Sequence, residues 1–328
     1  MLRVLMVVNK RWWEYKCPPF WPEQYQALAA CPGVDIRVTG ERWAGWKNQR
    51  TLRENINRLM PEADVVYLWR PLGIVEFPGI LGSEESLPQL KVSAYQDDPK
   101  ISVPEAQKVG LDLLFYHDHW DRQFFEGCGI RSVYLPLAVN LSLYKNWDTP
   151  YDQRKVSTIL TGSINPEVYP LRVTFQRMLQ RKMIAGHIRK APGYRLPSLK
   201  RVLQEQARYA NSLTQSKVSL VSSCPHIPLT LRKYFESLAA GCVLFGDVPA
   251  EPPTDVAKCI NVIHSNMSYS DIVSKIQQVL MDKEECERQR VRNRKVAEAY
   301  SYIKFAQRWV DAVKVSLAEK SAFRGTVR

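Results

Sequence analysis

The sequence predicts an α/β protein with two doubly wound, Rossmann-like domains followed by a helical tail. Short apolar runs rich in β-branched residues alternate with longer helical patterns throughout the 328 residues, as in repeated βα units. The chain is too long for one ordinary hydrophobic core and has the length of two domains. The alternation breaks once, around 140–154, where the sequence turns polar and Asp148-Thr149-Pro150 is typical of a turn.

Six strands are expected in the first half, because its apolar runs lack the polar alternation of strands with one solvated face. These runs cover residues 4–8, 35–38, 65–69, 92–95, 111–116 and 132–135. Helical patterns lie between them at 23–30, 52–59 and 118–127. The opening run is followed directly by Asn9, Lys10 and Arg11 and lacks a small-residue cleavage site. We therefore interpret it as the first strand rather than as a signal peptide.

A second series of strands and helices follows the break. Strands are predicted at 157–160, 218–221, 243–245 and 260–263, and helices at 168–180, 199–212 and 230–240. Ser198 is the expected N-cap of the second of these helices, and Gly241 is expected to end the third. The segment 270–318 is almost wholly helical in pattern. We expect domains at 1–145 and 146–300, with a C-terminal helix at 301–328 that packs back toward the N-terminal domain.

The composition is that of a globular protein from a reducing compartment. Hydrophobic residues make up 45% and aromatic residues 10% of the chain, which excludes a disordered protein. No apolar run approaches the roughly 20 residues of a membrane span. The seven cysteines lie far apart and include no Cys-x-x-Cys pair, which argues against a disulfide framework and against a structural zinc site. A cytoplasmic location is therefore expected.

Positive charge is concentrated in the second half of the chain. Residues 1–150 carry a net charge of −1 and residues 151–328 a net charge of +14. Ten Lys and Arg residues, with the single acid Glu205, lie between Arg172 and Arg208. A field of one sign attracts phosphates, acidic lipids or nucleic acid, so an anionic partner is expected. A polyanionic or membrane-associated acceptor, with the protein peripheral to the membrane, is one candidate, and DNA is another.

Ligands of doubly wound sheets bind at the carboxyl ends of the strands, so the loops that leave the strands carry the candidate site. The first loop is Leu160-Thr161-Gly162-Ser163, where a glycine follows a strand. Such a glycine lets backbone amides approach a phosphate beside the positive end of a helix dipole. An ordinary turn is the alternative, because no G-x-G-x-x-G follows the first strand of either domain. The same absence argues against a NAD-dependent dehydrogenase.

The second loop runs from Pro225 to Cys242 and enters the helix predicted at 230–240. Thr230 is a suitable cap for this helix. Arg232 and Lys233 place two cations in its first turn, which is the unfavourable end of the helix dipole unless an anion binds there. Glu236 follows on the same side of the helix. A surface ion pair between residues four apart is the alternative interpretation.

This stretch resembles the donor-binding segment of GT-B glycosyltransferases, in particular the branch called glycosyl transferases group 1 and its spore-maturation-protein-like members. The family pattern is a basic residue, an aromatic–Glu pair, a run of small residues and a glycine. It is matched in order by Lys233, Phe235, Glu236, Ala239, Ala240 and Gly241. Residues 134–144, 160–172 and 209–220 contain further similar stretches, so the resemblance extends from about residue 90 to 300.

The resemblance implies a donor that is a nucleotide-diphosphate sugar, most commonly a UDP-sugar, with no cofactor required and no bound metal. Glu236 would accept hydrogen bonds from the ribose hydroxyls of the donor. The amides of Leu229 and Thr230, with Arg232 or Lys233, would hold the diphosphate and stabilise it as the leaving group. Three residues of the facing loop and helix would assist, namely Gly162, Ser163 and Arg172.

One position departs from the family pattern. Many retaining relatives carry a second Glu eight residues before the ribose-binding one, and Pro228 stands there in this chain. The usual contact with the hexose is therefore missing, and the resemblance predicts neither the sugar nor a retaining outcome.

The third loop, 94–99, leaves a strand of the first domain, and His117-Asp118-His119 follows the next strand. An Asp before Pro recurs in this loop of the resembling branch, where it faces the cleft between the domains. Adjacent carboxylates raise one another's pKa, so Asp97 or Asp98 is the predicted base for an acceptor hydroxyl, with His119 or His117 as runner-up. A turn at Asp-Pro and a helix cap at Asp118 are the alternatives.

Three tryptophans around the first loop of the chain are a further candidate for contact with the acceptor. Trp12, Trp13 and Trp21 offer aromatic faces that suit sugar rings or flipped bases, and core packing is the equal alternative.

The predicted function is that of a glycosyltransferase acting on a hydroxyl of a glycoconjugate or a related molecule. One alternative keeps the chemistry but changes the acceptor: a phage-type DNA glycosyltransferase that modifies hydroxylated pyrimidine bases, to which the +14 half would bind. The nearly neutral first domain argues against it. Another alternative is a non-catalytic module that binds nucleotide sugars.

Overall fold

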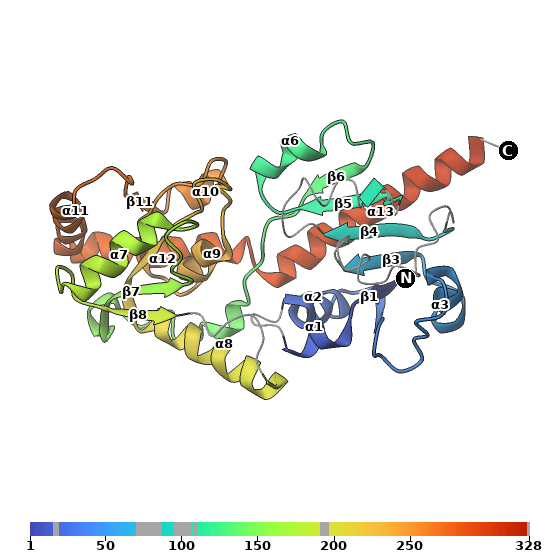
Figure 1. Ribbon diagram of the computed structural model, residues 1–328, viewed down its shortest axis with the longest axis horizontal. Helices are drawn as coiled ribbons and strands as arrows, with labels where there is room; N and C mark the ends of the chain where they lie inside the picture. Colours follow the sequence, from blue (N-terminus) through green and yellow to red (C-terminus); the bar gives the residue numbers. More distant parts are fainter. Residues whose placement is uncertain (16–19, 70–86, 95–105, 108–109, 191–196, 327–328) are drawn as a thin grey trace. The chain divides into compact units, whose positions relative to one another are not determined.

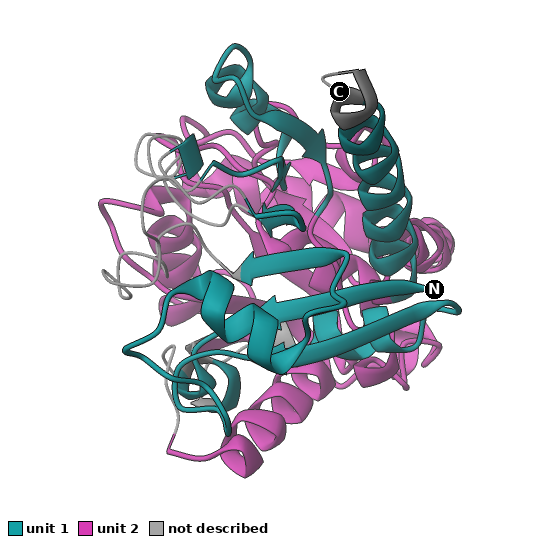
Figure 2. Cartoon of the chain, turned by 90° about the vertical axis from the view of Figure 1, so that its right-hand side faces the viewer, with its two compact units in different colours: residues 1–136, 303–328 teal, residues 137–302 magenta. Residues whose placement is uncertain are grey.

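The chain folds into two compact units, each built on one parallel β-sheet. The computed structural model describes the chain apart from residues 16–19, 70–86, 95–105, 108–109, 191–196 and 327–328 (Figure 1). Unit 1 comprises residues 1–136 and 303–328, and unit 2 comprises residues 137–302 (Figure 2). The predicted fold class, with two Rossmann-like α/β domains and a C-terminal helix, is confirmed.

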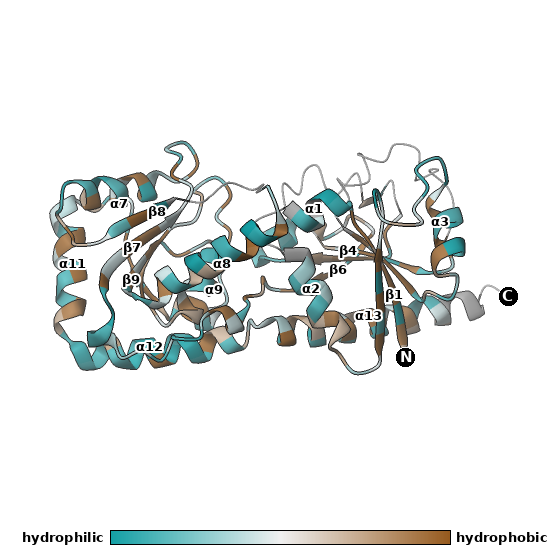
Figure 3. Cartoon of the chain, turned by 90° about the horizontal axis from the view of Figure 1, so that it is seen from below, coloured by the Kyte–Doolittle hydropathy of each residue, from teal (hydrophilic) through white to brown (hydrophobic). Residues whose placement is uncertain are grey.

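The sheet of unit 1 contains six parallel strands in the order β2-β1-β3-β4-β5-β6. The strands are β1 (Leu2–Val7), β2 (Val34–Thr39), β3 (Val65–Trp69), β4 (Leu90–Ala94), β5 (Leu113–Tyr116) and β6 (Arg131–Tyr134). Every residue of β4 and β5 is buried, which explains the apolar runs without polar alternation (Figure 3). All six predicted strands of the first half are therefore present.

Short helices connect these strands, and one long helix returns from the far end of the chain. They are α1 (Lys10–Tyr15), α2 (Phe20–Ala29), α3 (Leu52–Leu59), the 3₁₀ helix η1 (His119–Asp121), α6 (Arg122–Phe125) and α13 (Tyr302–Thr326). The single helix predicted at 118–127 is thus two short ones. α3 begins with a capping box, in which Thr51 and Glu54 each bond the other's backbone amide.

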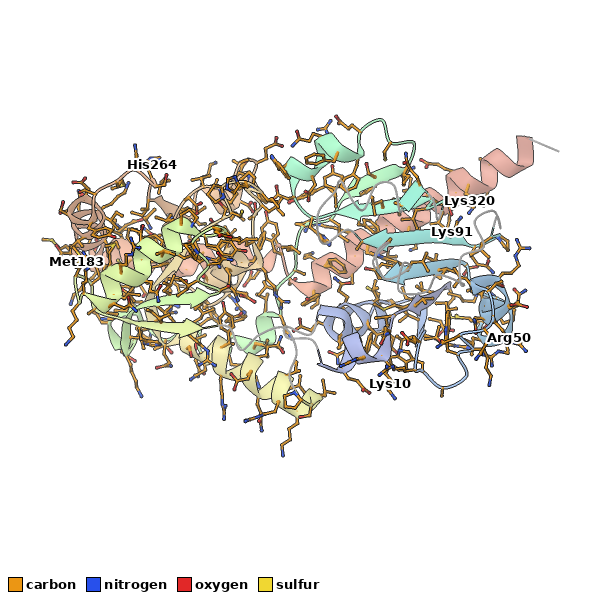
Figure 4. All side chains as sticks on the ribbon, in the orientation of Figure 1. Lys10, Arg50, Lys91, Met183, His264 and Lys320 are labelled. Atoms are coloured by element: carbon orange, nitrogen blue, oxygen red, sulfur yellow. The ribbon has the colours of Figure 1, made fainter. Side chains whose placement is uncertain are left out.

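The C-terminal helix α13 is part of the core of unit 1. Its Trp309 is fully buried, with its ring 5.3 Å from that of Tyr67 on β3 and 6.1 Å from that of Phe115 on β5. Further along, the ammonium of Lys320 lies 2.7 Å from the carboxylate of Asp112, which also accepts the amide of Lys91 (Figure 4). Packing and an ion pair therefore both attach α13 to the sheet.

The sheet of unit 2 contains five parallel strands in the order β11-β10-β9-β7-β8. The strands are β7 (Val156–Gly162), β8 (His187–Lys190), β9 (Ser216–Val221), β10 (Val243–Gly246) and β11 (Ile260–Val262). Its helices are α7 (Pro170–Gln180), α8 (Leu199–Thr214), α9 (Arg232–Ala239), α10 (Thr254–Ala257), α11 (Tyr269–Met281) and α12 (Lys283–Glu298), with 3₁₀ turns η2 (Leu141–Leu143) and η3 (Tyr151–Gln153). β8 was not predicted, because Ile188 is its single apolar residue.

The chain leaves unit 1 at Pro136, earlier than the predicted domain boundary between 145 and 146. Val139 and Tyr144 already belong to the core of unit 2. The amide of Val139 donates to the carbonyl of Tyr300 at 2.9 Å, where the chain leaves unit 2 again. The polar segment that resembled a linker is therefore packed against unit 2.

Helix α9 occupies the centre of unit 2. All of its eight residues are buried except Lys233, which is half-buried. Burying Phe235 and Leu238 stabilises the unit by about 1.5–3 kcal/mol for each side chain. The same helix carries Arg232 and Glu236 into the interior, which is costly for charges unless they are paired. Among the described helices, none combines the length and the apolar composition needed to cross a membrane.

Candidate functional site

The carboxyl end of β7 lies against two cationic side chains of unit 2. Gly162, the last residue of β7, has a φ of +99°, in the left-handed region that favours glycine. A Cβ at this position would lie 3.0 Å from Nη1 of Arg172 and 3.7 Å from Cε of Lys233. Three of the residues expected to contact a donor are therefore neighbours.

Arg172, on α7, connects two loops at this edge of the sheet. The buried guanidinium stacks on the ring of Tyr169 at 3.7 Å and donates to the carbonyls of Ser163 (3.1 Å) and Ser222 (2.8 Å). Burial lowers the pKa of Arg172, but a guanidinium remains charged at any physiological pH. Among the described residues, Nε of Arg172 and Oγ of Ser222 have no hydrogen-bond partner. This edge of the unit 2 sheet thus contains two hydrogen-bond donors that no described residue uses.

Helix α9 begins later than the sequence indicated. Its N-cap is Leu231, in an extended conformation and without a side-chain cap bond, so the prediction that Thr230 caps the helix is wrong. The chain turns into the helix one residue after Thr230, which is buried. The amide of Leu229 donates to a carbonyl two residues earlier at 2.8 Å. The first amides of the helix are therefore those of Arg232 and Lys233.

Glu236 is the buried centre of a cluster of hydrogen bonds and ion pairs. Its side chain is 4% exposed, and its Oε2 accepts the hydroxyl of Tyr209 at 2.8 Å and the ammonium of Lys233 at 2.9 Å. Its Oε1 lies 3.1 Å from Nε of Arg232. The ion pairs suggested by the sequence spacing are present, but they lie inside unit 2 and not on a helix surface.

The charges around Glu236 determine its protonation state. Burial alone would raise the pKa of Glu236, but Lys233 and Arg232, with hydrogen bonds from Lys233 and Tyr209, outweigh it. The net pKa is below the usual range for Glu. Glu236 is therefore a carboxylate at neutral pH, able to accept hydrogen bonds from a ligand.

Asp247 belongs to the same edge of the sheet and was missed by the sequence analysis. It follows β10 directly, and its carboxylate accepts the amide (2.9 Å) and hydroxyl (2.6 Å) of Ser223 and the hydroxyl of Tyr234 (2.8 Å). Tyr234 lies on α9, so Asp247 connects the ends of β9 and β10 to the helix that carries Glu236. The rule that ligands bind at strand ends could have identified this position.

The candidate base in unit 1 is described only in part. Asp97 and Asp98 lie outside the described residues. His119 is half-buried, and its ring stacks on that of Tyr134 at 3.8 Å. His117 is buried, with Nδ1 2.6 Å from the carbonyl of Leu135, and burial lowers its pKa. The Asp118 carboxylate accepts a backbone amide at the start of η1, so the alternative of a helix cap is correct for this residue.

Asp121 follows in the same segment, and sequence reasoning did not single it out. It is 1% exposed, and its Oδ1 has no hydrogen-bond partner among the described residues. Burial, together with the charge of Asp118, raises the pKa of Asp121 to about 7. Nothing in the residue type or spacing of Asp121 distinguishes it from a surface acid in the sequence.

The described residues of the basic segment 172–208 differ in their exposure and partners. Arg172 is buried, Arg189 pairs with Glu205 at 3.2 Å, and Arg177 is exposed on α7. In unit 1, Trp13 packs edge-on against Tyr25 and Trp43, whereas the side chains of Trp12 and Trp21 lie outside the described part of the chain. The described residues contain no cluster of three or more His, Cys, Asp or Glu side chains suited to a metal ion.

Comparison with known proteins gives structural neighbours over nearly the whole chain. Trehalose-6-phosphate synthase OtsA matches with a TM-score of 0.59 at 12% identity, covering 95% of this chain and 99% of the other. A trehalose-6-phosphate structure from E. coli bound with UDP-2-fluoro glucose gives 0.57 at 11% identity, with 95% and 99% coverage. WaaG, a glycosyltransferase of lipopolysaccharide biosynthesis, gives 0.51 at 10% identity, with 94% and 99% coverage. This chain has the GT-B fold.

The GT-B fold predicted from the sequence is therefore confirmed, whereas the comparisons do not distinguish the spore-maturation-protein-like branch. No protein-family model matches the sequence, and no curated protein is similar to it in sequence. In this GT-B chain, the carboxyl edge of the unit 2 sheet gathers Gly162, Arg172, Lys233 and Glu236.

Proposed function

We propose that this chain is a glycosyltransferase that moves a sugar from a nucleotide-diphosphate sugar to a hydroxyl acceptor, and that unit 2 binds the donor. The observation that carries the proposal is Glu236, a buried carboxylate kept charged by two cations beside a glycine turn. A carboxylate accepts two ribose hydroxyls, and adjacent cations bind a diphosphate.

The leaving group is the centre of the proposed chemistry. As the bond from the sugar to the diphosphate breaks, negative charge develops on the diphosphate. Lys233 and Arg172 would stabilise that charge, together with the first amides of α9. Gly162 would let the backbone approach the phosphates, because any side chain there would meet Arg172. Beside this site, the buried Nε of Arg172 and Oγ of Ser222 have no hydrogen-bond partner among the described residues.

The acceptor side of the proposal rests on unit 1. Asp97, Asp98 and His119 remain the predicted bases for the acceptor hydroxyl, whose proton must leave as the new glycosidic bond forms. We propose a metal-independent enzyme of the cytoplasm, acting on a glycoconjugate or another polyanionic or membrane-associated acceptor. UDP is the first nucleotide to test, since one structural neighbour was determined with UDP-2-fluoro glucose.

The test is thermal unfolding of the purified protein with UDP, GDP, dTDP, ADP and CMP. A ligand present at about 100 times its dissociation constant raises the free energy of unfolding by roughly 2.7 kcal/mol. One nucleoside diphosphate is expected to raise the midpoint of wild type. Glu236→Gln, which keeps the shape of the side chain but loses its charge, is expected to abolish that rise.

Glu284→Gln is the matched control, because Glu284 is 90% exposed and lies on α12. It should respond to the nucleotide as wild type does. If no nucleotide stabilises wild type at millimolar concentration, the proposed function is wrong. Hydrolysis of the matching nucleotide sugar, measured by release of the free diphosphate, distinguishes an enzyme from a module that only binds.

A further inference from the structure

Tyr209, on α8, contacts three residues of the proposed donor site at once. Its hydroxyl donates to Oε2 of Glu236 at 2.8 Å and lies 3.4 Å from Oγ1 of Thr161 on β7. The ammonium of Lys233 sits 4.0 Å from the centre of its ring. One side chain therefore restrains both the carboxylate and the lysine of the site.

The tyrosine is a permanent hydrogen-bond donor to the carboxylate. Burial and the negative charge of Glu236 raise the pKa of Tyr209 well above its ordinary value, so the phenol keeps its proton. The hydroxyl of Thr161 is a suitable donor to the phenol oxygen of Tyr209. The phenol proton then points to Glu236, so the two hydroxyls form one chain of hydrogen bonds that ends at the carboxylate. The negative face of the ring attracts the lysine cation.

A carboxylate has about four acceptor positions. On Glu236, Tyr209 and Lys233 both donate hydrogen bonds to Oε2, whereas Arg232 forms an ion pair with Oε1. Lys233 is only half-buried, so it is the partner free to move toward a diphosphate. Its departure would open an acceptor position on Oε2 of Glu236 for a ribose hydroxyl. Tyr209 and Arg232 would then keep the carboxylate in place.

We propose that Tyr209 is a positioning residue that holds Glu236 for two ribose hydroxyls and thereby selects ribonucleotide donors over deoxynucleotide ones. This inference rests on the proposed function. A residue that acts only through packing would weaken every nucleotide alike. A residue that orients Glu236 affects only ligands that carry the ribose hydroxyls.

The experiment measures, by calorimetry, the affinity for the best ribonucleoside diphosphate and for its 2′,3′-dideoxy analogue. Wild type should prefer the ribonucleotide. Tyr209→Phe should weaken the ribonucleotide about tenfold, the effect of losing one hydrogen bond to a charged group, and the analogue less than about twofold. Tyr300→Phe is the matched control, because its hydroxyl bonds a carboxylate of unit 2 outside the site, Asp255, at 2.6 Å. Its ratio of affinities should equal that of wild type.

Equal weakening of both nucleotides by Tyr209→Phe, or no change in either, overturns this inference alone. Failure of wild type to bind any nucleoside diphosphate overturns the proposed function and this inference with it. Thr161→Val provides a second variant if Tyr209→Phe does not fold. It removes the hydroxyl behind the phenol and should lower the ribonucleotide preference in the same direction.

Discussion

Glu236 in unit 2 and Asp121 in unit 1 are two buried carboxyl groups whose pKa values shift in opposite directions. Glu236 has Lys233 and Arg232 within hydrogen-bond distance, and its pKa is lowered. No cation among the described residues acts on Asp121, and burial and the like charge of Asp118 raise its pKa. Burial is common to both, so the neighbouring charges determine which carboxyl group can bind a ligand as an anion.

The opposite pKa shifts give Glu236 and Asp121 different chemical properties. Glu236 is a preformed acceptor for hydrogen bonds, which suits recognition of a polar ligand. Asp121 is a neutral acid below pH 7 and has no cation to keep it charged. Because both side chains are buried, the charge partner is what distinguishes Glu236 as the candidate for binding a ligand.

Arg232→Leu should break the Glu236 cluster and produce the largest effect. It removes the cation beside Oε1 of Glu236 and leaves a buried carboxylate incompletely paired, which should cost about 3–5 kcal/mol. Denaturant unfolding measures the loss. The double variant Arg232→Leu, Glu236→Gln should recover most of it, because the unpaired charge is then gone. A single variant as stable as wild type would show that Arg232 does not compensate the charge of Glu236.

Asp121→Asn should remove a pH dependence that wild type shows. Because the pKa of Asp121 is raised from 3.8 to about 7, the native protein holds a proton that the unfolded chain releases. The free energy of unfolding of wild type therefore falls as the pH rises through this range. The variant mimics the neutral acid, so its advantage should grow by about 1.4 kcal/mol per unit from pH 5 to 7 and then stay constant.

The measurement for Asp121→Asn is denaturant unfolding at pH 5, 6, 7 and 8 beside wild type. Asp152→Asn is the control for removal of a carboxylate, because that side chain is 58% exposed. Parallel pH curves for wild type and Asp121→Asn would contradict the assignment of a raised pKa.

Lys320→Met should have a smaller effect, because it removes the cation paired with the partly exposed carboxylate of Asp112. Asp112 is partly exposed and pairs with Lys320 at 2.7 Å, so loss of the cation should cost about 1 kcal/mol and less at high salt. Lys283→Met removes a pair with Asp152 in which both side chains are mostly exposed, and it should change nothing measurable. Thermal midpoints at low and high salt test both. An equal fall in the thermal midpoint of the two variants would mean that burial of an ion pair does not change its contribution to stability.

The sequence predicted the elements that depend on local pattern. The apolar runs of β4 and β5 and the cap Ser198 of α8 are where they were expected, because burial on both faces and capping leave local signals. The pairing of Glu236 with Arg232 and Lys233 was suggested by helical spacing. The sequence pattern of α9 did not reveal that its charged face is buried. Other elements of unit 2 cover that face, and such tertiary contacts leave no signal in the local sequence.

The remaining features depend on contacts between distant parts of the chain. Tyr209 and Glu236 lie on different helices, so no spacing rule joins their side chains. The burial of Asp121 likewise arises from tertiary packing. Thr230 was a reasonable cap by residue type, but Leu231 occupies the position where the backbone turns into the helix. Residue type and local spacing are therefore insufficient to predict the Tyr209–Glu236 contact, the burial of Asp121 or the N-cap of α9.

Because α13 completes unit 1 from residues 303–328, the six strands of unit 1 are synthesised long before the helix that packs on them. Synthesis at about 5–20 residues per second separates the end of β6 from α13 by roughly 10 s or longer. During that interval Tyr67 and Phe115 lack the Trp309 ring that packs against them. The sheet of unit 1 is therefore made first but lacks part of its core until the last helix of the described fold is made.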